Sequence, residues 1–66
     1  SDVVFLTDTY RQMVEEVIRL ITLQGTLTVS QFRDRFSTSR KYALAFLEYL
    51  DQCRITRRNG DVRTLT

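Results

Sequence analysis

The sequence predicts a small α+β domain in which three helices are followed by a β-hairpin. Apolar residues recur at the spacing of an amphipathic helix in three separate segments, and capping residues precede each segment. Near the carboxyl end, Asn59-Gly60 is a strong hairpin signal, because a type I′ turn needs positive φ at both central residues. With 66 residues, the chain is expected to form one domain that buries roughly 60% of its unfolded surface.

The first helix is expected from Thr9 to about Gly25. Thr9 followed by Gln12 matches a capping box, in which each side chain satisfies a free backbone donor. The core face is then formed by apolar residues at helical spacing: Tyr10, Met13, Val14, Val17, Ile18 and Ile21. The preceding segment 3–7 is β-prone and is expected to form an edge strand or a lead-in.

A short helix is expected next, after an extended piece at residues 26–28. Thr28 and Gln31 form a second capping-box match, which opens a helix from about Val29 to Phe36. Phe32 and Phe36 lie one helical turn apart and are expected to be its core anchors.

The third helix is expected from about Ser39 to Gln52, after a turn rich in capping residues. One face is apolar and is formed by Ala43, Phe46, Leu47 and Leu50. Cys53 is expected to extend this face as a small buried apolar residue.

Residues 55–65 are expected to form the hairpin, and the sequence leaves its register open. A two-residue loop pairs Arg58 with Asp61, whereas a three-residue loop places Arg57 across from Arg63. Asp61 is expected to support the turn or to hold an arginine. The complete order of elements is that of a winged helix, a three-helix helix-turn-helix core with a small antiparallel sheet and a hairpin wing.

Charge is divided unevenly along the chain. Residues 1–30 carry two arginines and four acids, whereas residues 31–66 carry eight cations and four acids. In the first half, Glu15 lies one helical turn from both Arg11 and Arg19 and can pair weakly with them. The excess in the second half points to a polyanion as partner; the alternative is that the basic residues only solvate a surface.

Catalysis is not expected from this chain. Histidine is absent, Cys53 is the only cysteine, and no phosphate-binding loop of the GxxxxGK type occurs, so no catalytic, metal or cofactor site can be assembled. The sequence has no apolar run near the ~20 residues of a membrane span. We expect a monomeric, cytoplasmic domain that is a fragment of a larger multidomain protein.

Two basic clusters are the candidate contact surface. The third helix starts with Arg40 and Lys41, although a helix start normally favours anions, so an external anion is expected to complete the site. The first cluster comprises Ser39, Arg40, Lys41 and Tyr42. The wing supplies the second, with Arg57, Arg58 and Arg63 around the Asn59-Gly60 turn. The middle of the third helix is apolar or acidic, with Glu48 and Asp51, and is poorly suited to a DNA groove. Two compact clusters suit the curved phosphates and unstacked bases of an RNA hairpin loop.

The same residues carry a family resemblance. FRDRF at 32–36, TSRKYALAFLEYLD at 38–51 and TRRNGDVRTL at 56–65 resemble the last winged-helix domain of the bacterial selenocysteine-specific elongation factor, SelB. The resemblance covers about residues 27–66 in the same order and spacing. It implies binding of the selenocysteine insertion (SECIS) element, an mRNA hairpin beside the UGA codon, within a parent GTPase that also binds selenocysteinyl-tRNA and the ribosome.

The resemblance also implies the contact residues: Arg33, Arg40, Lys41, Tyr42, Arg57, Arg58, Gly60 and Arg63. Gly60 would let a phosphate or base approach a bare backbone. Two alternatives remain open from the sequence. One is a DNA-binding winged helix of a transcription regulator, and the other is a winged helix used for protein contacts.

Overall fold

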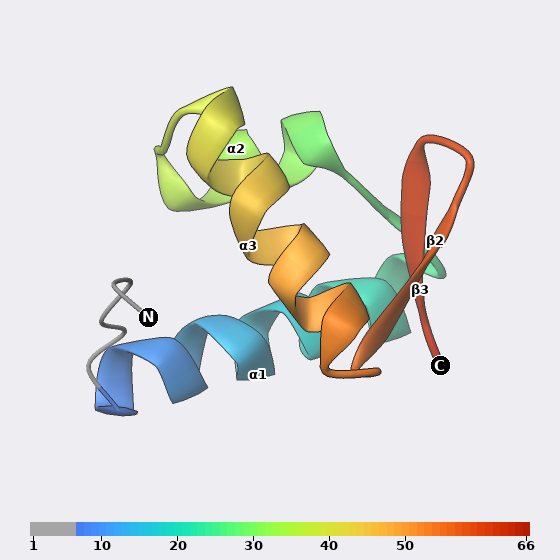
Figure 1. Ribbon diagram of the computed structural model, residues 1–66, viewed down its shortest axis with the longest axis horizontal. Coiled ribbons are helices and arrows are strands. Elements are labelled where there is room, and N and C mark those ends of the chain that lie inside the picture. Colours follow the sequence, from blue (N-terminus) through green and yellow to red (C-terminus); the bar gives the residue numbers. More distant parts are fainter. Residues whose placement is uncertain (1–6) are drawn as a thin grey trace.

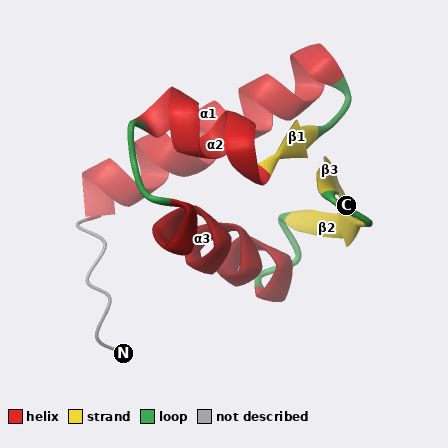
Figure 2. Ribbon diagram, turned by 90° about the horizontal axis from the view of Figure 1, so that it is seen from above, coloured by secondary structure: helices red, strands yellow, loops and turns green. Residues whose placement is uncertain are grey.

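The computed structural model describes residues 7–66 and has the predicted order of elements (Figure 1). The helices are α1 (Thr7–Gln24), α2 (Val29–Phe36) and α3 (Arg40–Gln52), and the strands are β1 (Leu27–Thr28), β2 (Thr56–Asn59) and β3 (Val62–Leu65). The strands form an antiparallel sheet in the order β1-β3-β2, and they lie together at one side of the three helices (Figure 2). The predicted α+β, winged-helix fold is confirmed.

Helix α1 begins earlier than expected. Its first residue is Thr7, so Thr9 lies inside the helix and the predicted capping box with Gln12 does not start it. Residues 3–6 of the expected edge strand lie outside the described residues, and Thr7 is helical. The predicted end is confirmed, because Gly25 adopts a left-handed φ of 88° and its amide donates to the Ile21 carbonyl at 2.6 Å.

The starts of α2 and α3 follow the predicted caps. The Thr28 amide donates to Gln31 Oε1 at 2.9 Å, and the Gln31 amide donates to Thr28 Oγ1 at 3.0 Å, which confirms the second capping box. Ser39 caps α3, since its Oγ accepts from the Tyr42 amide at 3.1 Å. Its hydroxyl is therefore committed to holding the helix that presents Arg40.

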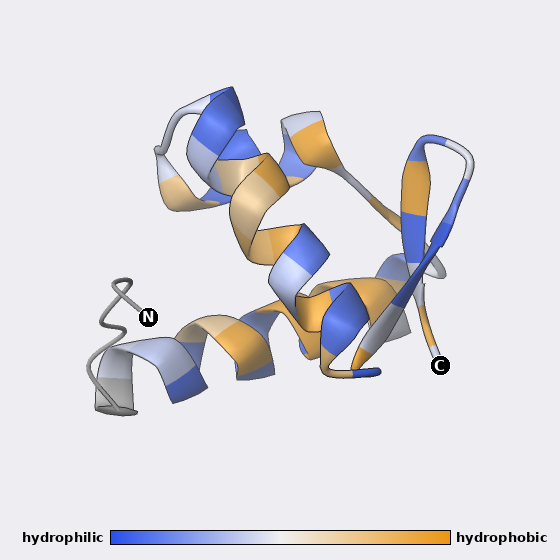
Figure 3. Ribbon diagram, viewed as in Figure 1, coloured by the Kyte–Doolittle hydropathy of each residue, from blue (hydrophilic) through white to orange (hydrophobic). Residues whose placement is uncertain are grey.

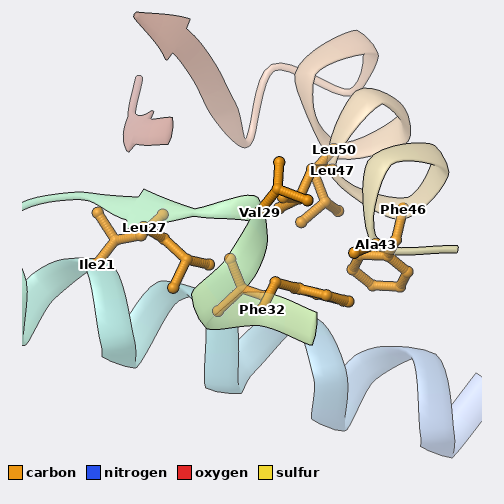
Figure 4. Close-up of a cluster of buried hydrophobic side chains, with 9 residues drawn as sticks. Ile21, Leu27, Val29, Phe32, Ala43, Phe46, Leu47 and Leu50 are labelled. Carbon is orange, nitrogen blue, oxygen red and sulfur yellow. The ribbon is translucent and has the colours of Figure 1, made fainter. Parts of the chain in front are cut away.

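The core lies where the three helices and β1 meet. Each helix contains apolar residues (Figure 3), and the buried ones form a cluster with Leu27 of β1 (Figure 4): Val17, Ile21, Leu27, Val29, Phe32, Ala43, Phe46, Leu47 and Leu50. Phe32 is fully buried, and its ring centre lies 5.2 Å from that of Phe46. We expect truncation of Phe32 to alanine to cost about 3–5 kcal/mol of stability, because the site is closed on all sides.

Cys53 is exposed, so the prediction that it is buried was wrong. The apolar face of α3 ends at Leu50, and Cys53 is the C-cap residue beyond the last helical turn. Arg54 then takes a left-handed conformation with φ of 63°, which turns the chain toward β2.

The hairpin adopts neither of the two expected registers. Asn59 pairs with Val62 and Arg58 pairs with Arg63, which leaves Gly60 and Asp61 as the loop. Gly60 has a φ of 66°, and Asp61 is not among the positive-φ residues. Positive φ at only the first central position is the pattern of a type II′ turn, so glycine occupies that position rather than the second.

Candidate nucleic-acid interface

A surface depression lies where the start of α2, the start of α3 and the wing (β2, β3 and their loop) meet. Its volume is about 300 Å³. Three elements line it: Thr28, Val29 and Ser30 at the start of α2, Arg40 and Leu44 on α3, and Arg58, Gly60, Asp61 and Arg63 of the wing. Arg40 of the first predicted cluster and Arg58 and Arg63 of the second thus line one concave site, which we call the basic pocket.

Arg40 and Arg58 are the exposed cations of the basic pocket. Arg58 is oriented by its own loop, because its Nε donates to the Gly60 carbonyl at 3.0 Å. Within residues 7–66, neither Arg40 nor Arg58 forms an ion pair with an acid. Both guanidinium groups are consequently available to an external anion.

Arg63 lies in the basic pocket but is almost completely buried, with 2% of its surface exposed. Its Nη2 lies 3.0 Å from Asp51 Oδ2, and its Nε donates to the same carboxylate at 3.2 Å. The Arg63 side chain is therefore paired inside the domain. Asp61 was expected either to support the turn or to hold an arginine. Asp51 holds Arg63, and Asp61 is the second residue of the wing loop.

The position of Asp51 corrects one argument from the sequence. We expected both Glu48 and Asp51 to present negative charge from the middle of the third helix. Glu48 is exposed, but Asp51 turns inward to Arg63 and to the Thr56 hydroxyl, which donates to it at 2.6 Å. Of these two acids, Glu48 is therefore the one that presents an exposed negative charge.

Lys41, Tyr42 and Arg57 are exposed outside the basic pocket. Lys41 and Tyr42 belong to the first turn of α3, and the Tyr42 ring lies 6.3 Å from that of Phe46 at an interplanar angle of 25°. Arg57 lies between Thr56 and Arg58 in β2, so its side chain points to the opposite face of the wing. Figure 3 shows that β2 is hydrophilic along most of its length.

Arg33 lies apart from the other predicted contact residues. It is half-buried near the carboxyl end of α2, whereas the basic pocket adjoins the start of that helix. Its Nε lies 3.4 Å from Asp34 Oδ1, which is a weak exposed pair. The structure does not bring Arg33 together with Arg40 and Arg58.

Sequence reasoning missed four lining residues: Thr28, Val29, Ser30 and Leu44. The first three open α2, where free backbone N–H groups concentrate partial positive charge. The predicted capping box at Thr28 was the available signal, because it marked a helix start that can attract an anion.

A different set of cations is neutralised between α1 and α2. Glu16 of α1 accepts hydrogen bonds from Arg19 at 2.7 Å and from Arg35 of α2 at 2.9 Å. The Arg19 hydrogen bonds, with a further contribution from Arg35, lower the pKa of Glu16 to about 2. The predicted pairing of Arg19 with Glu15 was wrong, because its partner is Glu16, three residues away.

Burial also shifts the pKa of Tyr10 in α1. Desolvation, together with a hydrogen bond to Tyr49, raises the pKa of Tyr10 to about 12.

Among residues 7–66, no group of three or more potential metal ligands is found. A search of this same part of the chain finds no helix with the length and apolar character needed to cross a membrane.

Two comparisons with known proteins found a match. Residues 19–65 match the family model described as elongation factor SelB, winged helix. A solved structure of the mRNA-binding domain of elongation factor SelB from E. coli, in complex with SECIS RNA, is similar with a TM-score of 0.82 and 32% sequence identity. The match covers 89% of this chain and 49% of the E. coli chain, so this chain spans about half the length of the E. coli chain. The search among curated proteins gave no match. With most of its length matched by the family model, the chain belongs to the SelB elongation-factor winged-helix family.

Proposed function

We propose that this domain binds the loop of the SECIS mRNA hairpin through the basic pocket and the residues beside it. The observation that supports this most directly is the union of Arg40, Arg58 and the start of α2 around one depression, in a chain similar to a SECIS-bound domain. Binding tethers the larger factor near its codon.

The size of the basic pocket favours a local feature of RNA over a regular duplex. A volume of about 300 Å³ is at the lower end of small-ligand pockets and suits one nucleotide. Unstacked bases are available mainly in loops, bulges and ends of RNA. The leading guest is therefore one unstacked loop nucleotide with its flanking phosphates.

Each exposed residue has a distinct role in this proposal. Arg40 and Arg58 meet phosphates or base edges, because a planar guanidinium donates two parallel hydrogen bonds. Lys41 adds a point charge, and Tyr42, 37% exposed, offers a face for stacking. Gly60 is exposed, and the space around its Cα is open, so a backbone or base can approach closely.

Arg57 and Arg33 have outer roles. Arg57, on the opposite face of the wing, is expected to meet the stem phosphates rather than the loop nucleotide. Arg33 is expected to contribute least, because it is half-buried and already near Asp34. Ser39 acts indirectly, by capping the helix that presents Arg40.

A DNA-binding role is less well supported. The middle of α3 is committed to the core through Ala43, Phe46, Leu47 and Leu50, and its exposed Glu48 would repel a phosphate backbone. We further infer that the domain itself is not an enzyme. Its parent is expected to be a cytoplasmic translational GTPase that delivers selenocysteinyl-tRNA to the ribosome.

The proposal is tested by titrating the 66-residue chain, at two salt concentrations, against three labelled nucleic acids. These are a SECIS stem-loop, the same stem with a scrambled loop, and a DNA duplex of equal length. We expect the SECIS stem-loop to bind at least tenfold more tightly than the scrambled loop, which corresponds to about 1.4 kcal/mol or more. Equal affinity for all three would refute selective binding, and tighter binding of the duplex would support the DNA alternative.

A further inference from the structure

One carboxylate holds both long strands of the wing against α3. Asp51, in the last turn of α3, accepts from the Thr56 hydroxyl of β2 at 2.6 Å and from Arg63 Nε of β3 at 3.2 Å. Thr56 and Arg63 are the buried polar residues of the described chain, with 1% and 2% of their surfaces exposed. Asp51, which is 23% exposed, therefore joins the buried Thr56 and Arg63 in a polar network at the base of the wing, which we call the wing anchor.

The wing anchor is a costly arrangement for a domain of this size. A buried guanidinium must recover its lost hydration from its partners, and apolar replacements of buried ion pairs are often as stable as the pairs. Arg63 Nη2 is buried and lies 3.0 Å from Asp51 Oδ2, but it has no hydrogen bond of good geometry. Stability alone thus gives little reason for a charged group at this position.

The sheet register supplies a different reason. Arg63 lies directly across from Arg58, and directly opposed like charges repel each other. Both side chains point to the face of the wing that meets α3, since paired residues of adjacent strands share a face. Asp51 neutralises Arg63 and leaves Arg58 without an acid partner in residues 7–66.

We infer that Arg63 is a positioning residue, which acts through Asp51 to fix Arg58 and Gly60 relative to Arg40 and does not itself contact RNA. This inference rests on the proposed function and changes the role expected for Arg63 from the sequence. A contact residue and a positioning residue differ in one measurable respect. A phosphate contact adds to the salt dependence of RNA binding, whereas a residue paired inside the protein does not.

The first test compares two variants in binding to the SECIS stem-loop at several salt concentrations. Arg63→Met leaves the Asp51 carboxylate, which is 23% exposed, without a cation to pair with, and we expect affinity to fall about tenfold with an unchanged salt slope. The triple variant Asp51→Leu, Thr56→Val, Arg63→Met replaces all three polar side chains of the wing anchor by apolar side chains of similar size. We expect it to restore affinity to within about threefold of the wild type, because no unpaired charge is left.

Two results would overturn the positioning role. One is a salt slope that falls by about 0.7 in both variants, as expected for loss of one phosphate contact to single-stranded RNA. The other is a folded triple variant that binds no better than Arg63→Met. Circular dichroism reports whether each variant is folded before binding is measured.

A second measurement needs no RNA and stays decisive if the triple variant does not fold. Asp51→Asn retains the size of the side chain and an acceptor for Thr56 but removes the charge that pairs with Arg63. Hydrogen exchange of the RNA-free chain is expected to quicken at the amides of β2 and β3 and to stay unchanged in α1. Unchanged exchange in the wing would refute the inference. Failure of the wild type to select the stem-loop would instead count against the proposed function, and the exchange result would still decide the wing anchor.

Discussion

The cations of this domain fall into two regions with opposite electrostatic arrangements. On the α1–α2 side, Arg19 and Arg35 share Glu16, whose pKa their hydrogen bonds lower to about 2. At the start of α3 and in the wing, Arg40, Lys41, Arg57 and Arg58 have no acid partner among the described residues. The same residue type therefore joins two helices in one region and is left available in the other.

This difference shows why a count of arginines is a poor guide to the binding site. Arg63 lies in the basic pocket by position but resembles the paired set, because Asp51 neutralises it. Available charge, rather than total charge, distinguishes the two regions. The following predictions test that distinction, from the largest expected effect to the smallest.

The largest effect is expected at Arg58. Arg58→Ala should weaken binding of the SECIS stem-loop by about 1–3 kcal/mol, the range for loss of a specific bidentate contact. Fluorescence anisotropy measures the affinity. The free energy of unfolding should change by less than about 0.5 kcal/mol, because Arg58 is exposed and its hydrogen bond among residues 7–66 is to the Gly60 carbonyl of its own loop.

Arg19→Ala is the matched control for Arg58→Ala. It removes the same charge from the α1–α2 side, where Arg19 is 55% exposed and paired with Glu16. We expect no change in affinity. Similar losses for Arg19→Ala and Arg58→Ala would mean that RNA senses only the overall charge of the domain.

The two glycines provide a second comparison between the regions. Gly60 and Gly25 have left-handed φ values of 66° and 88°, and an added Cβ would meet no atom within 4 Å at either position. Substitution of each by alanine should cost about 1 kcal/mol of stability from backbone strain alone. Only Gly60→Ala should also weaken RNA binding, and equal affinity of the two variants would exclude close approach of RNA at the wing loop.

The smallest effect is expected at Glu16. A carboxyl group with a lowered pKa stabilises the folded state above its unfolded value, near 4.5, and this contribution is lost as the pH falls toward about 2. Glu16→Gln should therefore be less stable than the wild type at pH 7, and the difference should shrink between about pH 4.5 and pH 2. Urea unfolding at several pH values measures this, and a difference that is independent of pH would contradict the ion-pair account.

Local signals in the sequence predicted most of the fold. The capping box at Thr28 and the cap at Ser39 located α2 and α3, because hydrogen bonds within four residues set a helix start. The same pattern at Thr9 was misleading, since α1 already begins at Thr7. Cys53 continues the helical spacing of the apolar residues of α3, and it was therefore predicted to be buried. The helix ends at Gln52, so that spacing does not apply to Cys53, which is exposed.

The site was predicted less completely than the fold, because pairing across the chain decides it. Arg40 and Arg58 were recognised from local charge, and both line the basic pocket. The pairing of Asp51 with Arg63 joins residues twelve positions apart and depends on the hairpin register, which Asn59-Gly60 did not settle. Sequence patterns reveal which residues are charged, whereas only the packed structure reveals which charges are already neutralised.

The most direct test of available charge is the salt dependence of SECIS stem-loop binding in two double variants. Arg40→Gln with Arg58→Gln removes two unpaired cations, and Arg19→Gln with Arg35→Gln removes two paired ones. We predict that the first pair lowers the slope of log Kd against log salt by about 1.4, or about 0.7 for each lost contact, and that the second pair leaves it unchanged. Equal decreases in the two double variants would contradict the account.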